Sequence, residues 1–290
     1  MSADARQVYR YMDIGTAKPS KADRDRVAHH LIDIVDPDEK LTAGEYARQA
    51  GDAICDIQKR SKTPVVVGGS GLYIRALVDG LFEEAGSDDE VRRGLKARAA
   101  HEGSFGLHEE LRRVDPEAAA RIHPHDVHRI VRALEVFEIT GQRISELQRA
   151  RRRAFGVFEP TWKRKRLMVG LALDRAVLCR RIEERVDAMI AQGLVDEVQG
   201  LLDKGYGPHL NALKSVGYQE VFPYLEGRQT LRATIEAIKR NSRRYAKRQM
   251  TWFRRDGRIW WLDGSKDRKR LVERILERYS VYSRGLEILS

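Results

Sequence analysis

Residues 61–77, which read SKTPVVVGGSGLYIRAL, decide the fold class of this chain. The run of three valines at 65–67 is continuous and β-branched, as in a strand that is buried on both faces of a parallel sheet. Three glycines between positions 68 and 71 allow a sharp turn, and helical periodicity resumes at Leu72. A strand, a glycine turn and a helix in this order form half of a parallel α/β unit.

Two further segments predict strands, one at Leu31–Val35 and one at Leu167–Leu173. Periodic apolar positions predict helices at 43–58, 175–193, 194–205 and 230–254. The stretch from 83 to 160 is helical in pattern and has no clear strand. We therefore predict two domains, an α/β core made of 1–82 and 161–290 and a helical insertion at 83–160.

The balance of charge favours a polyanionic partner. The 290 residues include 54 Lys and Arg against 43 Asp and Glu, a net charge of +11. A surface this basic attracts phosphates, so we favour a nucleic-acid partner over a basic face that is merely solvated. Residues 151–166 are especially basic and carry interleaved aromatic side chains.

The cysteines and the apolar runs of the sequence bear on where the protein is found in the cell. The two cysteines, Cys55 and Cys179, form no CxxC pair, so neither a disulfide framework nor a zinc site is predicted. We expect a cytoplasmic protein with no membrane partner, because no apolar run approaches the ~18 residues of a membrane span.

The segment MSADARQVY at 1–9 holds the first candidate catalytic group. Asp4 is expected at the carboxyl end of a strand, and ligands of parallel sheets bind beyond that end. Asp4 and Ser70 are therefore expected to face one crevice. A carboxylate there can deprotonate a nucleophile or hold a metal ion through water. A helix cap or a frayed chain end is the alternative.

Three further features suit anionic ligands. His128, Arg129 and Arg132 lie early in a predicted helix, where the helix dipole does not favour cations, so an anionic partner or an ordinary solvated face is expected. Lys214 beside Ser-Val-Gly is suited to a phosphate. The glycine turn at 68–71 either presents N–H groups to an anion or is simply tight. The three histidines at 123, 125 and 128 have poor spacing for a metal site.

The blocks of this sequence, in their order, resemble the tRNA dimethylallyltransferase family. They include SADARQVYRYMDIGTAKP, HHLIDIVDP, VVVGGSGLY, RIHPHDVHRIVRALE, LKSVGY and YAKRQMTWFRR. The resemblance implies an α/β fold, a P-loop NTPase-like parallel sheet core with a mostly helical insertion domain. It implies transfer of a dimethylallyl group from dimethylallyl diphosphate to N6 of adenosine 37, in the anticodon stem-loop of tRNA. It further implies Mg²⁺ and, in our interpretation, a monomer.

The resemblance also assigns roles to residues. Asp4 matches the catalytic aspartate that accepts a proton from the adenine amine, and Ser70 shares its site. Gln7 would bind the edge of the flipped base, while Lys214, Gly69 and Gly71 would hold the diphosphate. Positions that match tRNA contacts are Asp4, Ala5, Arg6, Gln7, Ser70, Arg92, His128, Arg129, Ile130, Val131 and Arg132.

The sequence departs from the family pattern at three points. Ala5 replaces the usual Ser, and Ser70 replaces the usual Thr. No G-x-x-x-x-G-K-[ST] motif occurs in the 290 residues, whereas the family has a first strand and a P-loop ahead of the Ser-Ala-Asp turn. We expect the true start to lie upstream, together with a Mg²⁺ ligand, and the chain as written to be a poor enzyme. Two alternatives are a tRNA-binding protein without chemistry and a prenyltransferase of free adenine nucleotides.

Overall fold

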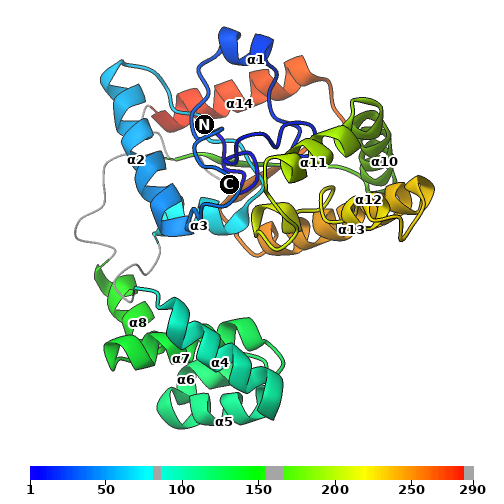
Figure 1. Ribbon diagram of the computed structural model, residues 1–290. Coiled ribbons are helices and arrows are strands. Elements are labelled where there is room, and N and C mark those ends of the chain that lie inside the picture. The colour runs from blue at the N-terminus through cyan, green and yellow to red at the C-terminus, as the bar shows by residue number, and fades with distance from the viewer. Residues whose placement is uncertain (81–85, 155–165, 284–290) are drawn as a thin grey trace. The chain divides into compact units, whose positions relative to one another are not determined.

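The protein consists of two compact units (Figure 1). The computed structural model describes residues 1–80, 86–154 and 166–283. The first unit combines Met1–Gly80 with Lys165–Ser290, and the second is Leu81–Arg164. The first unit is therefore discontinuous in sequence. No helix in these described ranges is long and apolar enough to cross a membrane.

The first unit is mixed α/β and rich in helices. The predicted helices are confirmed as α2, α3, α10, α11 and α13, and the sequence reasoning missed α14. A capping box of Thr42 and Glu45 starts α2, whose periodic apolar side chains Tyr46, Ala50 and Ile54 are buried. The helices are α1 (Lys21–Arg26), α2 (Ala43–Lys59), α3 (Gly71–Asp79), α10 (Arg175–Ala191), α11 (Leu194–Asp203), α12 (Phe222–Leu225), α13 (Leu231–Phe253) and α14 (Arg268–Ser283).

A small parallel sheet lies in the same unit. Strand β1 (Met168–Ala172) confirms the prediction at 167–173, and it pairs with β2 (Ile259–Asp263), which was not predicted. The register runs from Met168 opposite Ile259 to Ala172 opposite Asp263. Gly170 lets the Trp261 ring pack directly on the strand, because an added Cβ would lie 2.6 Å from that ring.

The predictions of regular strands at 31–35 and 65–67 were wrong. Each forms one isolated parallel bridge, Tyr9 with Val35 and Ser2 with Val67. Leu31 and Asp33 have positive φ angles of 64° and 56°, which interrupt an extended run. The valines were expected to be buried on both faces, yet Val67 is 67% exposed. Val67 forms backbone hydrogen bonds with Met1 and Ala3, a pairing too short to count as a strand.

The described residues of the second unit form helices and the loops between them. Its helices are α4 (Asp89–Glu102), α5 (Ser104–Val114), α6 (Pro116–Arg121), α7 (Val127–Thr140) and α8 (Ile144–Ala154). Aspartates cap three of them, Asp88 before α4, Asp115 before α6 and Asp126 before α7. Leucine, isoleucine and alanine side chains of α4 to α7 meet in one apolar core.

The glycine turn at 68–71 is a point of close packing. A Cβ at position 68 would lie 2.2 Å from the Ala3 carbonyl oxygen. The same atom at Gly69 would meet the Gln249 amide, and at Gly71 it would meet the Trp252 ring. Both of these neighbours belong to α13. The glycines therefore allow the start of the chain and α13 to approach the turn.

Replacing Gly68 should destabilise the fold. Gly68→Ala forces a methyl group against fixed backbone, and we expect a loss of about 1–3 kcal/mol in the free energy of unfolding. Gly200→Ala, in the interior of α11 where a Cβ meets nothing within 4 Å, should instead gain about 0.5–1 kcal/mol. Chemical denaturation of the two variants checks the pair, and equal stabilities would contradict the packing account.

Candidate functional site

Asp4 and Ser70 lie in adjoining turns. The Asp4 Oδ1 atom accepts hydrogen bonds from the backbone N–H of Arg6 at 2.8 Å and of Gln7 at 3.4 Å. The Ala5 N–H donates to Ser70 Oγ at 2.8 Å, and the Ser70 N–H donates to the Ala3 carbonyl at 3.1 Å. Backbone bonds thus place the carboxylate and the hydroxyl beside each other.

The negative charge of Asp4 acts on two tyrosines from other elements. Burial raises the pKa of Tyr245 on α13, and the negative charge of Asp4 adds to that effect. Burial is also the main cause that raises the pKa of Tyr73 on α3, with a smaller contribution from Asp4. The Tyr73 hydroxyl donates to the Leu41 carbonyl at 3.1 Å. Both phenols therefore stay neutral near pH 7.

Arg185 on α10 is a cation on which the charge of Asp4 acts. The protein around it lowers the pKa of its guanidinium, and the charge of Asp4 opposes that shift. The side chain nevertheless keeps its solvent access. A guanidinium with a lowered pKa and an exposed side chain is expected in a concave part of the surface, where protein surrounds the group and water still reaches it.

Gln7 is used within the chain. Its Oε1 accepts from the Ser2 hydroxyl at 2.9 Å. Its Nε2 donates to the carbonyls of Thr16 and Ala17, each at 3.2 Å. Binding a base edge, as the resemblance implies, would exchange these bonds for bonds to the base.

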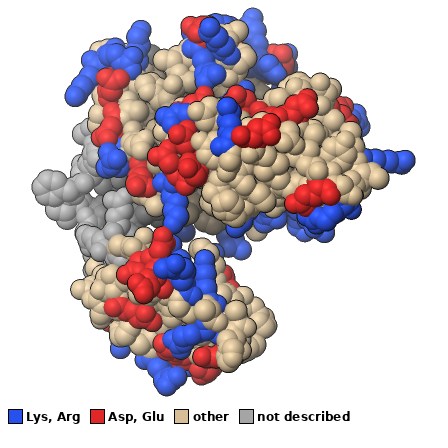
Figure 2. All heavy atoms as spheres, viewed as in Figure 1, with Lys and Arg blue, Asp and Glu red and all other residues tan. Residues whose placement is uncertain are grey.

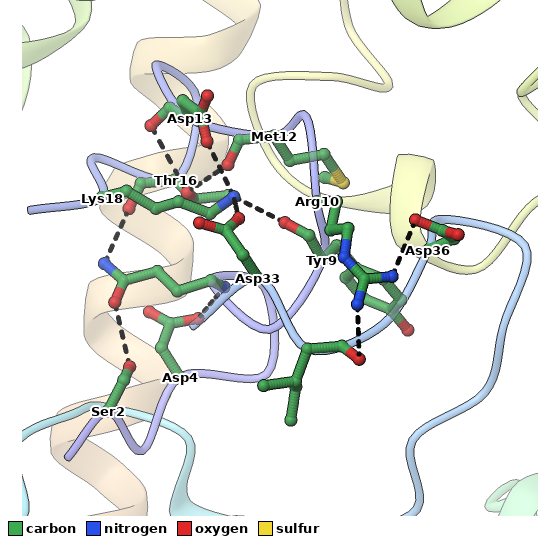
Figure 3. A network of polar contacts seen from close by, with 12 residues as sticks. Ser2, Asp4, Tyr9, Arg10, Met12, Asp13, Thr16, Lys18, Asp33 and Asp36 are labelled. Carbon is green, nitrogen blue, oxygen red and sulfur yellow. Dashed lines mark hydrogen bonds and ion pairs between the residues drawn. The ribbon is translucent and has the colours of Figure 1, made fainter. Parts of the chain in front are cut away.

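Lys18 anchors the loop that follows the Asp4 turn (Figure 3). Its side chain is only 2% exposed. The ammonium donates to the Tyr9 carbonyl at 2.6 Å and to Asp13 Oδ1 at 2.8 Å, and it also pairs with Asp33. A buried lysine with three oxygen partners is well compensated, so the loop at 9–18 is held firmly.

Glu197 is a site-supporting residue that sequence reasoning missed. Its Oε2 accepts from the backbone N–H of Asp13 at 2.9 Å and of Ile14 at 2.7 Å. Its Oε1 accepts from the Gly15 N–H at 3.1 Å and the Tyr218 hydroxyl at 2.6 Å. Burial, with the adjacent charge of Glu197, raises the pKa of Tyr218. An acidic residue in the first turn of α11 was the available signal, and it indicates only a favourable helix dipole.

The predicted diphosphate residues do not form one cluster here. Lys214 ends the short turn Ala212–Lys214 and is exposed. Within the described ranges no hydrogen bond or ion pair joins it to the glycine turn. Gln249 Nε2 donates to the Gly69 carbonyl at 2.9 Å. Packing against α13 is therefore the role that the structure gives Gly69 and Gly71. Arg6 donates to the Asn211 carbonyl at 2.8 Å, which brings the 212–214 turn near the start of the chain.

Buried Glu135 organises the predicted tRNA contacts of the second unit. Its carboxylate is inaccessible to water and pairs with Arg92 at 2.8 Å and with Arg132 at 3.0 Å. The Asp88 N–H donates to it as well, at 3.1 Å. His128 and Arg129 are exposed at the start of α7. One carboxylate thus fixes the direction of two arginines.

Two of the predicted tRNA contacts have side chains buried in the second unit. Ile130 and Val131 are 0% and 2% exposed and belong to the apolar core of the second unit. Helical periodicity turns both side chains inward, so neither can touch a ligand through its side chain.

The charges on one face of the molecule are mixed. On the face drawn in Figure 2, basic and acidic side chains are interspersed over each unit. The basic stretch at 151–166 lies almost wholly outside the residues whose side chains the structure describes. No group of three or more His, Cys, Asp or Glu could hold a metal ion within the described part of the chain.

Removing the charge of Glu135 should destabilise the second unit. Glu135→Gln leaves Arg92 and Arg132 without their buried counter-charge, and we expect a loss of about 3 kcal/mol in the free energy of unfolding. Glu138→Gln, at an exposed position of the same helix, should change it by less than about 0.5 kcal/mol. Thermal unfolding of both variants measures the difference, and a wild-type midpoint for Glu135→Gln would contradict this role.

Comparison with known proteins gives one consistent result. The family model described as IPP transferase matches residues 7–256. The tRNA dimethylallyltransferase of Geobacter metallireducens is 52% identical over 263 residues, which cover 91% of this chain and 83% of that protein. The enzyme of the same name from Geobacillus thermodenitrificans is 46% identical over 274 residues, 94% of this chain and 84% of that protein.

Solved structures agree with this result. The full-length tRNA isopentenylpyrophosphate transferase of Bacillus halodurans has a TM-score of 0.68 at 37% identity, covering 98% of this chain and 88% of that one. A eukaryotic dimethylallyltransferase acting on tRNA has a TM-score of 0.78 at 25% identity, covering all of this chain and 74% of the other. The family match takes in the Gln7 turn, the whole second unit and α13, and this chain belongs to the IPP transferase family, a family of prenyltransferases.

Proposed function

We propose that this protein transfers a dimethylallyl group from dimethylallyl diphosphate to the N6 amine of adenosine 37 in tRNA, next to the anticodon. The relatives named tRNA dimethylallyltransferase support the reaction, and the net charge of +11 suits an RNA substrate. The observation that carries the proposal is the Asp4 turn, in which two backbone N–H groups aim a carboxylate beside Ser70.

The chemistry assigned to Asp4 follows from its bonds. Oδ1 is occupied by Arg6 and Gln7, so Oδ2 accepts a hydrogen bond from the N6 amine. The nitrogen lone pair forms a bond to the allylic carbon as the bond from that carbon to the diphosphate oxygen breaks. The amine becomes cationic, and its proton passes to the carboxylate. The acceptor base must first leave its stack, at a cost of a few kcal/mol.

The departing diphosphate needs positive charge. Lys214 is the proposed cation from this chain, with Gly69 and Gly71 lining the approach. Mg²⁺ usually keeps several waters and binds substrate phosphates, so the diphosphate would supply its main oxygen ligands while Asp4 stays with the N6 amine. When bound, the ion would neutralise charge on the leaving group.

The proposal extends to fold and to RNA contacts. The short parallel pairings at 1–3 with 65–67 and at β1 with β2 are consistent with a P-loop NTPase-like sheet. Exposed His128 and Arg129, together with Arg92 and Arg132, are the proposed grip on the anticodon stem. Ala5 and Arg6 would contact the RNA beside Asp4.

Asp4→Asn is the decisive variant. An asparagine Oδ1 accepts the same two N–H bonds, so the turn should persist and tRNA affinity should stay within about twofold. The rate of transfer should fall by about 10²–10⁴-fold, because the proton acceptor is lost. Nucleoside mass spectrometry of unmodified tRNA after incubation with dimethylallyl diphosphate measures the product. Asp38→Asn, at an exposed carboxylate, is the control and should keep the wild-type rate.

Three results would redirect the proposal. Full transfer by Asp4→Asn would remove the base role. A wild-type chain that binds tRNA and transfers nothing would be a tRNA-binding protein. Transfer to free adenine nucleotides in preference to tRNA would make it a nucleotide prenyltransferase.

A further inference from the structure

The Lys214 turn, residues 212–217, is buried on both sides of its lysine. Leu213 and Ser215 are 0% and 6% exposed, and Tyr218 just beyond the turn is inaccessible to water. Lys214 itself is exposed between these buried neighbours. Because the stem of a lysine is flexible, the backbone that carries it sets the region that its ammonium can reach. The reach of Lys214 therefore depends on what holds the turn.

Glu220 is a buried carboxylate that holds the Lys214 turn. Its Oε2 accepts from the Gly217 N–H at 2.7 Å, and its Oε1 accepts from Asn241 Nδ2 on α13 at 2.8 Å. Gln219 Nε2 donates to the same Oε1 at 3.0 Å. The residue is only 7% exposed. The carboxylate thus joins the turn to a long helix.

The bonds around Glu220 specify one shape of the turn. Each of the three donors is a neutral N–H group. A buried carboxylate that relies on such donors loses free energy when one of them moves away, because an unmade hydrogen bond to a buried charge is costly. Gly217 meets this requirement with a φ of 103°, a conformation that favours glycine. The turn is therefore held in one conformation.

Tyr218 fixes the Lys214 turn from the side of Asp4. Its hydroxyl donates to Glu197 at 2.6 Å, and the same carboxylate holds the loop that follows the Asp4 turn. The Tyr218 ring packs on Gly15 of that loop, where an added Cβ would lie 2.4 Å from the ring. The turn is thus tied to the Asp4 segment through Tyr218 and to α13 through Glu220.

We propose that Glu220 is a positioning residue for Lys214, and that through the Lys214 turn it directs the ammonium to the diphosphate of the prenyl donor. The inference rests on the proposed function, which assigns Lys214 to the departing diphosphate. Glu220 itself touches no substrate. It fixes the backbone from which the cation projects, so the positive charge is in place before the leaving group develops its own charge.

The test measures the affinity for inorganic diphosphate by isothermal titration calorimetry, so it needs neither tRNA nor turnover. Lys214→Gln should weaken binding about tenfold, in line with the loss of one charged hydrogen bond. Glu220→Gln keeps the shape of the side chain but turns an N–H group toward one of its donors, and it should weaken binding about fivefold. The double variant should bind as Lys214→Gln does, because both residues act through one contact.

Two further variants serve as control and as reserve. Glu236→Gln, at an exposed position of α13, is the matched control and should leave the affinity within about twofold. Asn241→Ala removes the bond to α13 and leaves the bond from Gly217 to Glu220 in place. It should reproduce part of the loss and should cost Lys214→Gln nothing further, which keeps the test open if Glu220→Gln does not fold.

A purely structural role for Glu220 would give a different result. The midpoint of thermal unfolding and the fraction of active protein would fall, while the folded protein would bind diphosphate with unchanged affinity. Unchanged affinity in Glu220→Gln, or the same loss with and without Lys214, would therefore overturn the proposal. A wild-type protein that does not bind diphosphate would overturn it as well.

The proposed function and the positioning role fail separately. Binding that falls in Lys214→Gln but not in Glu220→Gln would end the positioning role and leave the assignment of Lys214 intact. Transfer by Asp4→Asn is decided in a different experiment, because Asp4 is assigned to the amine and not to the diphosphate.

Discussion

Two backbone hydrogen bonds between residues 1–3 and Val67 position the Asp4 and Ser70 turns of the candidate site. The Met1 carbonyl accepts from the Val67 N–H at 3.0 Å, and the Ala3 N–H donates to the Val67 carbonyl at 2.7 Å. Both turns that carry functional groups leave this pair in the same direction. Ala5 takes part only through its N–H, which holds Ser70, so the hydroxyl usual at position 5 is not needed for that contact. The relation between Asp4 and Ser70 is therefore built from main chain.

Charged side chains of both signs secure the next segment. The Glu197 carboxylate accepts from the N–H groups of residues 13–15. The Lys18 ammonium donates to the Tyr9 carbonyl and to the carboxylates of Asp13 and Asp33. Because Glu197 bonds to the donors of this loop and Lys18 to its acceptors, few polar groups of the loop are left without a hydrogen bond. Lys18 therefore holds the loop in place.

The helices and the neighbourhood of Asp4 could be predicted from sequence, because each depends on local pattern. The lack of regular strands at 31–35 and 65–67 could not, because a strand needs a partner and no residue type signals the positive φ of Leu31 or Asp33. Glu197 and Arg185 reach the site from more than 180 positions along the chain, beyond any motif. Ile130 illustrates a conflict, since periodicity places it on the apolar face while family resemblance places it against tRNA, and its burial agrees with periodicity.

The discontinuity of the first unit sets an order of events during synthesis. The bonds from Glu197 to residues 13–15 span 182 to 184 positions, and Gln249 reaches Gly69 across 180. The helices of the second unit contact one another within residues 89–154, so their pairings close much shorter loops and form more quickly. It can therefore fold as it leaves the ribosome, whereas residues 1–80 wait for α10, α11 and α13. During that interval the exposed valines at 65–67 are open to wrong partners, so translation speed and chaperone binding bear on the yield of this protein.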